Sequence, residues 1–222
     1  MSEGWLPSPF DRYTTQKALN GLISHILFGG NVTEATEELV ASLLRQKGFV
    51  VATDVKIRCQ GETTYGGQKK DIPVDIVAID PMKRQLIIGE VKSWWGSIGL
   101  TPNHIVGHWP EKPSQFVKSF KILNDKDGLR GKFERLVRNQ YGDYEYKFVL
   151  YAGRVKKEDQ IRTNIERITM FDRPVELITI RELLVEFIST LSDDSSRDST
   201  YNNEIAIATL QALNEYQMLR ED

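Results

Sequence analysis

Hydrophobic positions between Asn31 and Gly48 follow a helical spacing. The apolar residues recur at 32, 35, 39, 40, 43 and 44, which places them on one face of an α-helix. Asn31 or Thr33 is suited to cap the start of this helix, and Gly48 is suited to its end. The pattern predicts an amphipathic helix over residues 31–48.

The pattern then changes to that of strands. Residues 49–57 are rich in Val, and the segments 71–80 and 83–92 are rich in Val and Ile. Asp80-Pro81 joins the last two segments, and proline at the second position of a tight turn favours a hairpin. We expect Asp80 to pair with Lys83, which sets Asp75 opposite Ile88.

Two acids and a lysine then share one face of the hairpin, because side chains alternate along a strand. Asp75 and Glu90 become diagonal neighbours roughly 7 to 8 Å apart, and Lys92 lies on the same face. The surrounding residues are apolar, and a buried carboxylate needs a partner. The sequence leaves two partners open, a hard divalent cation or an ion pair of Lys92 with Asp75 or Glu90.

Further elements follow in alternation. The sequence predicts a mixed helical region at about 112–139, a strand at 146–152, a helix near 156–168, a short strand at 175–178 and a helix at 180–191. The resulting order, αβββαβ, predicts an α/β fold.

These strands carry a family resemblance. Pro73-Val74-Asp75, then a gap of 14 residues, then Glu90-Val91-Lys92 resembles the signature of PD-(D/E)XK nucleases. The resemblance covers residues 31–155 and has the general look of Holliday-junction resolvases. It implies a restriction-endonuclease-like αβββαβ core with a mixed central sheet flanked by helices. In this core Asp75 and Glu90 hold Mg²⁺, with Mn²⁺ able to substitute. It also implies that Lys92 assists water activation or charge stabilisation.

The same resemblance implies a further acid on the preceding helix. Of Glu34, Glu37 and Glu38, helical geometry places Glu37 nearest the apolar stripe. Glu37 is therefore our candidate for an additional metal or water contact. The alternative is that all three acids only complement the helix dipole.

Nuclease branches of this kind also place a glutamine early in the helix after the Glu-X-Lys strand. Gln115 is the candidate in this sequence, and Lys118 is one helical turn further on. We expect them to contact a phosphate or the attacking water. The alternative is an ordinary polar helix start capped by Ser114.

Composition bounds the organisation of the chain. Its 222 residues, 40% of them apolar, suffice for one sizeable core. We predict a helical extension at 1–30, a nuclease-like domain at 31–191, and an acidic linker with a helix at 192–222. No apolar run reaches the length of a membrane helix and the start lacks a secretory signal, so we expect a cytoplasmic protein without a membrane partner.

Charge is unevenly distributed around the net value of −2. Residues 192–222 hold seven acids and two bases, whereas residues 109–140 hold eight bases and four acids. A basic face at 109–140 is able to neutralise phosphates in a salt-dependent way, and a solvated helix surface is the equal alternative.

Two further features leave alternatives open. Trp94 and Trp95 follow Lys92 directly and suit either stacking on bases or packing at the core edge. The helical patterns before residue 31 and after residue 202 suit either a homodimer interface or packing within the chain.

The sequence therefore predicts a Mg²⁺-dependent deoxyribonuclease, with Asp75, Glu90, Lys92 and Glu37 at its centre and endonucleolytic action on DNA. The alternative keeps the fold without the chemistry. The chain is then an inactive module for nucleic-acid binding or protein assembly, and the three charged residues form a structural ion-pair network.

Overall fold

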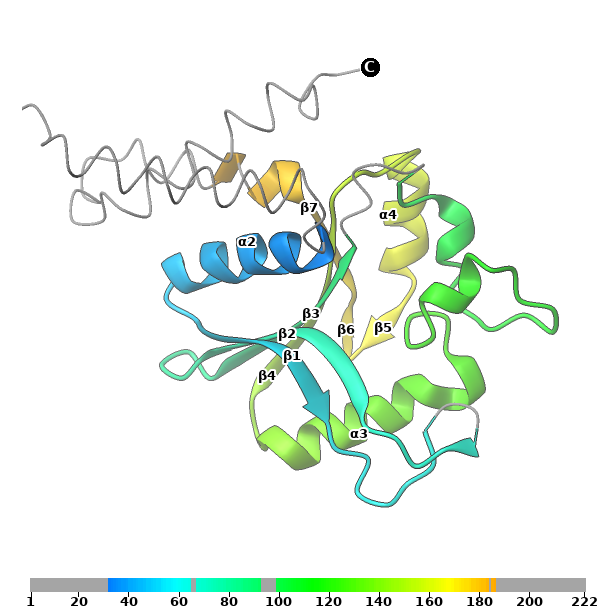
Figure 1. Cartoon of the computed structure of the whole chain (residues 1–222), viewed down its shortest axis with the longest axis horizontal. Coiled ribbons are helices and arrows are strands. Elements are labelled where there is room, and N and C mark those ends of the chain that lie inside the picture. The colour runs from blue at the N-terminus through cyan, green and yellow to red at the C-terminus, as the bar shows by residue number, and fades with distance from the viewer. Residues whose placement is uncertain (1–31, 65–66, 93–98, 184, 187–222) are drawn as a thin grey trace, which may run out of the picture. The chain divides into compact units, whose positions relative to one another are not determined.

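A five-stranded mixed sheet organises the compact unit Thr36–Leu183 (Figure 1). The computed structural model describes residues 32–64, 67–92, 99–183 and 185–186. The first three strands are antiparallel and the last two are parallel to the third. In spatial order they are β1 (Val50–Ile57), β2 (Ile72–Asp80), β3 (Gln85–Lys92), β4 (Glu145–Ala152) and β7 (Glu176–Thr179). The predicted α/β class with a mixed central sheet is confirmed.

Helices flank both faces of this sheet. Figure 1 shows α2 (Val32–Gln46) on one face and α3 (Leu129–Tyr141) on the other. α2 buries Val40 and Leu44, and the chain leaves it through Gly48, whose φ is +87° and whose N–H donates to the carbonyl of Arg45. The helix predicted at 31–48 is therefore present with the end that glycine favours.

The opposite face carries the main core. Phe133 and Leu136 of α3 are fully buried there with Leu86 and Ile88 of β3. The rings of Phe133 and Phe148 meet edge to face with centroids 6.2 Å apart, a favoured aromatic geometry. α4 (Glu158–Glu166) adds Ile161 and Ile165 to the same core, so one continuous apolar cluster holds this face.

The mixed helical region predicted at about 112–139 contains an α-helix only in its second half. Residues 112–128 form turns with two short 3₁₀ helices, Val117–Ser119 and Lys126–Gly128, and the α-helix begins only at Leu129. Asp125, Asp127 and Gly128 all have positive φ just before it. Left-handed residues interrupt a right-handed helix, so the earlier segment is free to turn across the sheet. A small hairpin, β5 (Thr169–Met170) with β6 (Arg173–Pro174), was not predicted.

The predicted hairpin forms with a longer turn and a different register. Asp80 pairs with Gln85, not with Lys83, and residues 81–84 make the turn. The carboxylate of Asp80 accepts hydrogen bonds from the N–H groups of Met82 and Lys83, both at 3.0 Å, and Lys83 Nζ lies 3.1 Å from it. This capping holds Lys83 in the turn. The shift is two residues, so the predicted side-chain face is preserved.

Several predictions fall on residues that are not described. The extension at 1–30, the segment 192–222 with its proposed dimer helix, and Trp94 and Trp95 lie outside the described residues. Among the helices that are described, none has the length and apolarity to cross a membrane.

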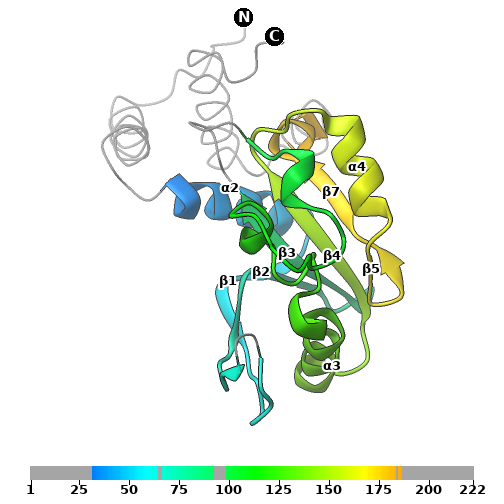
Figure 2. The same cartoon turned by 90° about the vertical axis from the view of Figure 1, so that its right-hand side faces the viewer.

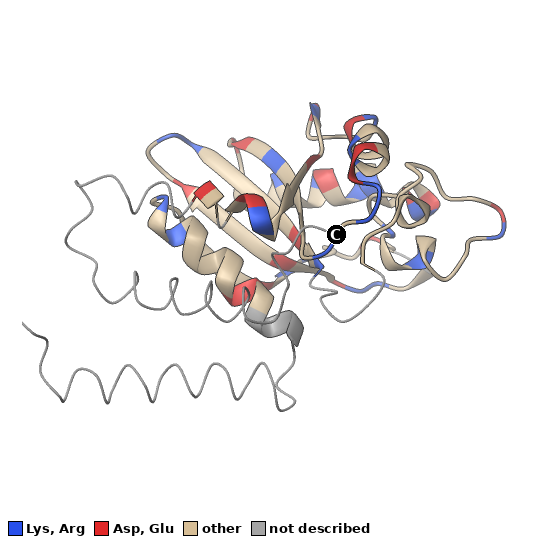
Figure 3. Cartoon of the chain, turned by 90° about the horizontal axis from the view of Figure 1, so that it is seen from above, with Lys and Arg blue, Asp and Glu red and all other residues tan. Residues whose placement is uncertain are grey.

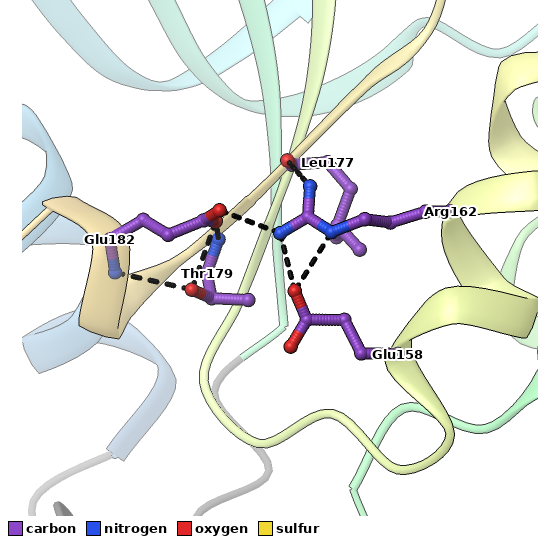
Figure 4. A network of polar contacts seen from close by, with 5 residues as sticks. All are labelled: Glu158, Arg162, Leu177, Thr179 and Glu182. Carbon is purple, nitrogen blue, oxygen red and sulfur yellow. Dashed lines mark hydrogen bonds and ion pairs between the residues drawn. The ribbon is translucent and has the colours of Figure 1, made fainter.

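A capping network fixes the chain where β7 passes into the next helix (Figure 4). The N–H of Glu182 donates to Thr179 Oγ1 at 3.1 Å, and the N–H of Thr179 donates to Glu182 Oε2 at 2.7 Å. This reciprocal pair is a capping box. Arg162 of α4 adds hydrogen bonds to Glu182 at 2.7 Å, to the carbonyl of Leu177 at 3.0 Å, and to Glu158.

Thr179→Ala should lower the free energy of unfolding by about 0.5–2 kcal/mol, because a helix N-cap is lost. Burial raises the pKa of Glu182, but hydrogen bonds from Thr179 and Arg162 outweigh it and lower the pKa below its ordinary value of 4.5. Glu182 therefore stabilises the fold above that ordinary value and loses this effect as pH falls through its lowered pKa. Urea unfolding of Glu182→Gln at several pH values should show a deficit at neutral pH that shrinks in acid. Glu166→Gln, at an exposed position of α4, is the control and should stay within about 0.5 kcal/mol of the wild type.

Gly89 sits where only glycine fits. A Cβ there would lie 2.9 Å from Cε2 of Tyr151 and 3.1 Å from Cβ of Ile76, both of which are buried. Gly89→Ala should therefore cost about 1–3 kcal/mol of stability through overpacking. Gly131→Ala, in an exposed helical position with no atom within 4 Å of the added Cβ, should instead stabilise by about 0.5–1 kcal/mol. Equal effects of the two variants in urea unfolding would contradict this assignment.

Candidate functional site

The candidate site lies where β2 and β3 separate. Their ladder ends at the pair Ile76 and Gly89, whereas β2 goes on pairing with β1 as far as Ile72 and Ile57. Figure 2 shows the β1–β2 ribbon and its connecting loop extending beyond β3. Beyond Ile76 and Gly89, β2 therefore stays paired with β1 but is no longer paired with β3.

Asp75 is the first residue of β2 beyond this ladder. Its Oδ2 accepts a hydrogen bond from the N–H of Val91 at 2.6 Å, so a side chain takes over the acceptor role that a backbone carbonyl has within a ladder. Across on β1, Asp54 has φ +49° and the β1–β2 register skips the Asp54–Asp75 pair. Asp75 thus has a fixed place at the point of divergence.

Glu90 and Lys92 meet Asp75 at this point. Continuing the observed register sets Asp75 directly opposite Glu90, not diagonal to it as predicted. Lys92 Nζ lies 2.7 Å from Glu90 Oε1 and 3.9 Å from Asp75 Oδ2. The three side chains are only 22 to 27% exposed. The ion pair that the sequence left open is therefore present, and both carboxylates share one ammonium group.

The cluster shifts the pKa of two of its members. Burial favours the neutral amine of Lys92, but the negative charges of Glu90, Asp75 and Glu37 outweigh burial and raise its pKa above the ordinary value. Burial, with the charge of Asp75, raises the pKa of Glu90 against the opposing effect of Lys92. Lys92 is accordingly held as a cation, which suits it to stabilise negative charge and not to accept a proton.

Of the acids on α2 whose side chains are described, Glu37 is the one whose charge acts on Lys92. Its neighbour Glu38 is instead paired with Arg45 at 2.6 Å on the exposed side of the helix. The side chain of Glu34 lies outside the described residues. Glu37 therefore lies within electrostatic range of Lys92, whereas Glu38 is engaged by Arg45.

A pocket of about 210 Å³ adjoins the cluster through Glu90. Its other walls come from the outer half of β2, from the turns at 118–123 and from the start of α3. Lys92 is connected to this pocket as well, because its Nζ lies 5.8 Å from the ring centroid of Phe120. The lining residues are Ile72, Pro73, Glu90, Lys118, Ser119, Phe120, Lys121, Ile122, Leu123 and Leu129.

Asn124 fixes the turns that form this pocket. The side chain is fully buried, and its amide donates to the carbonyl of His104 at 2.8 Å and accepts the N–H of Val106 at 2.8 Å. It also donates to the carbonyl of Val117 at 3.3 Å. Sequence reasoning missed Asn124, although a polar residue directly after the apolar pair Ile122 and Leu123 was a signal. It also missed Phe120 and Lys121.

The prediction for the glutamine needs correction. Gln115 is exposed in a turn before the 3₁₀ helix Val117–Ser119, not in an α-helix, and it does not line the pocket. Ser114 does cap this turn, since its Oγ accepts the N–H of Val117 at 3.3 Å. Lys118 does line the pocket. Of the two residues expected to act together, Lys118 therefore lines the pocket and Gln115 lies outside it.

The basic region at 109–140 is largely engaged within the fold. Arg138 pairs with Asp172 at 3.0 Å, Arg135 with Glu62, and Arg130 donates to the carbonyl of Leu123 at 2.8 Å. Figure 3 shows basic and acidic positions interspersed over the described elements and no continuous basic strip. The total charge of the segment therefore does not describe a basic surface, and the lysines that line the pocket are Lys118 and Lys121.

The donor set bears on whether a metal ion fits. Within the part of the chain that the structure describes, no group of three or more His, Cys, Asp or Glu side chains is arranged to hold one. Asp75 and Glu90 nevertheless offer two carboxylates at one ammonium position. Mg²⁺ is usually bound by one or two carboxylates together with waters and substrate phosphates. The residues therefore fit a cation that completes its ligands from solvent and substrate.

Comparison with known proteins supplies no assignment. No family model matches the sequence, and neither the curated proteins nor the solved structures contain a match. The functional assignment therefore rests on the geometry of Asp75, Glu90 and Lys92 and on the adjoining pocket.

Proposed function

We propose that this chain is a metal-dependent nuclease that hydrolyses phosphodiester bonds in DNA on a restriction-endonuclease-like core. The observation that carries the proposal is the convergence of Asp75, Glu90 and Lys92 where β2 leaves β3, beside a pocket lined by Lys118 and Lys121. The element order α2-β1-β2-β3-α3-β4 and the Pro73-Val74-Asp75 and Glu90-Val91-Lys92 spacing support it.

Each residue has a chemical role in this proposal. Asp75 and Glu90 would hold Mg²⁺ or Mn²⁺, and Glu37 would be a further metal or water contact. A divalent cation in such a site lowers the pKa of water and polarises a phosphoryl oxygen. Hydrolysis would form a bond from the water oxygen to phosphorus as the bond to the leaving oxygen breaks, and the proton released by the water would pass through solvent to that leaving oxygen. Lys92, held as a cation, stabilises the negative charge that develops on the phosphate and positions the water.

One observation favours a second candidate, the inactive binding or assembly module. The ammonium of Lys92 lies against both carboxylates in the same place that a cation needs. The ion-pair network is complete without metal, which is also what a purely structural role requires. The two candidates differ in their predicted effect of removing Lys92. Only the nuclease would lose metal-dependent cleavage of DNA.

Asp75→Asn or Lys92→Gln should lower metal-dependent DNA cleavage by a factor on the order of 100 or more. The assay uses supercoiled plasmid, linear duplex, single strand and four-way junction with Mg²⁺, Mn²⁺ or EDTA. Asp54→Asn is a matched control, because Asp54 lies across the ribbon from Asp75 and asparagine tolerates its positive φ. Lys83→Gln, at an exposed turn position, is the control for Lys92.

A circular dichroism spectrum of each variant checks that the fold is retained. Undiminished cleavage by Asp75→Asn and by Lys92→Gln would contradict the nuclease assignment. If neither the wild type nor any variant cleaves DNA but the wild type shifts DNA in a gel, the binding module is favoured.

Mg²⁺ should raise the melting temperature of the wild type. A ligand that binds only the folded state raises the free energy of unfolding by about 2.7 kcal/mol at a ligand concentration of 100 Kd. Asp75→Asn should lose this shift. Lys92→Gln should keep or enlarge it, since the ammonium no longer competes for the carboxylates. Thermal denaturation with and without Mg²⁺ measures this without reference to activity. A shift that survives in Asp75→Asn would place the metal elsewhere.

A further inference from the structure

The pocket beside Glu90 combines an apolar floor with a basic rim. Ile72, Phe120, Leu123 and Leu129 are each no more than 2% exposed and form its floor. Exposed residues, among them Lys118 and Ser119, form the rim together with the half-buried Lys121. An occupant would therefore place an apolar body inside and a negative group at the mouth.

The volume limits the size of that occupant. Pockets that bury drug-sized ligands measure roughly 300–1,000 Å³, whereas this one measures about 210 Å³. It is too small for the edge of a duplex and admits one small group. A nucleotide has the right character, since the faces of its base are apolar and its phosphate is anionic.

The pocket is also placed to work together with the charged cluster. Glu90 belongs to both, and Lys92 Nζ lies 2.7 Å from Glu90 and 5.8 Å from the ring centroid of Phe120. A nucleotide in the pocket would therefore be adjacent to a phosphate held by a divalent cation at Asp75 and Glu90. The nucleotide next to the scissile phosphate on the same DNA strand is therefore the occupant that fits this position.

We propose that this pocket binds one unpaired nucleotide of the strand that is cut, with base and sugar on the apolar floor and phosphate between Lys118 and Lys121. The inference rests on the proposed nuclease function and adds the class of substrate. A base in a continuous duplex is stacked and paired, and it must leave the stack to enter a pocket. Single-stranded, mismatched or branched DNA is therefore preferred over continuous duplex.

Binding is tested first, in EDTA, so that cleavage plays no part. Fluorescence anisotropy measures the affinity of the wild type for a labelled short oligothymidylate at several salt concentrations. Lys118→Ala/Lys121→Ala should weaken binding and reduce the slope of log K against log salt by about 0.7 for each phosphate of the single strand that a lysine no longer neutralises. Ser119→Trp, which fills the pocket from its rim, should weaken binding roughly tenfold or more.

Matched controls separate the pocket from general charge and bulk. Lys156→Ala/Arg167→Ala removes the same charge at exposed positions that do not line the pocket, and Thr163→Trp adds the same bulk on an exposed position of α4. Both should bind as the wild type does. Thermal denaturation of every variant checks folding.

Cleavage with Mg²⁺ is tested second, on one sequence presented as single strand, as continuous duplex and as duplex with one mismatch. The wild type should prefer the unpaired substrates, and Ser119→Trp should lose that preference. Absence of oligothymidylate binding by the wild type, or equal binding by both pocket variants, overturns the pocket proposal. Cleavage of continuous duplex at least as fast as single strand, unchanged in the pocket variants, also overturns it and leaves the nuclease function standing. Loss of binding in the pocket variants without cleavage of any substrate refutes hydrolysis and supports the pocket.

Discussion

The hydrogen bond from the N–H of Val91 to the carboxylate of Asp75 marks the place on which the site depends. Inside a sheet, a strand satisfies its N–H groups with carbonyls of its neighbour. Because β2 is not paired with β3 on the N-terminal side of Ile76, Val91 would lose such a partner, and the side chain of Asp75 supplies one. The divergence of the two strands and the position of the first carboxylate are therefore one feature, and the space for a pocket follows from it.

Charge at this point is retained in an apolar setting. Buried ion pairs contribute little net stability because desolvation offsets their attraction. Apolar residues in the places of Glu90 and Lys92 would suit the neighbouring Val and Ile, whereas an apolar residue in the place of Asp75 would leave the N–H of Val91 without its acceptor. The sheet therefore has a structural use for the carboxylate of Asp75, while Glu90 and Lys92 add charges that the strands themselves do not require. The raised pKa of Lys92 follows from the same crowding of acids around one cation.

Sequence reasoning recovered the sheet and the shared face of the charged residues for a physical reason. Side-chain direction repeats every two residues in a strand, so the unpredicted shift from Lys83 to Gln85 as the partner of Asp80 left every side chain on its expected face. The turn itself was mispredicted because the carboxylate of Asp80 accepts two backbone N–H groups within the turn, a local geometry that Asp-Pro alone does not specify. The mixed helical region at 112–139 was not divided into its parts, because the break before the α-helix comes from the positive φ of Asp125 and Asp127, which their residue type does not specify.

The pocket was beyond sequence reasoning because no single segment forms it. Ile72, Glu90 and Phe120 come from three parts of the chain, and they meet only because the turns after residue 117 fold back across the end of β2. Those turns are tied down by Asn124, whose partners on the other side are backbone groups of His104 and Val106 and therefore leave no trace in the residue types. A side chain that bonds to backbone selects a geometry without selecting a partner residue. The charged cluster is thus readable from the strand pattern, whereas the surface that would choose among substrates is set by turns whose placement only the folded chain reveals.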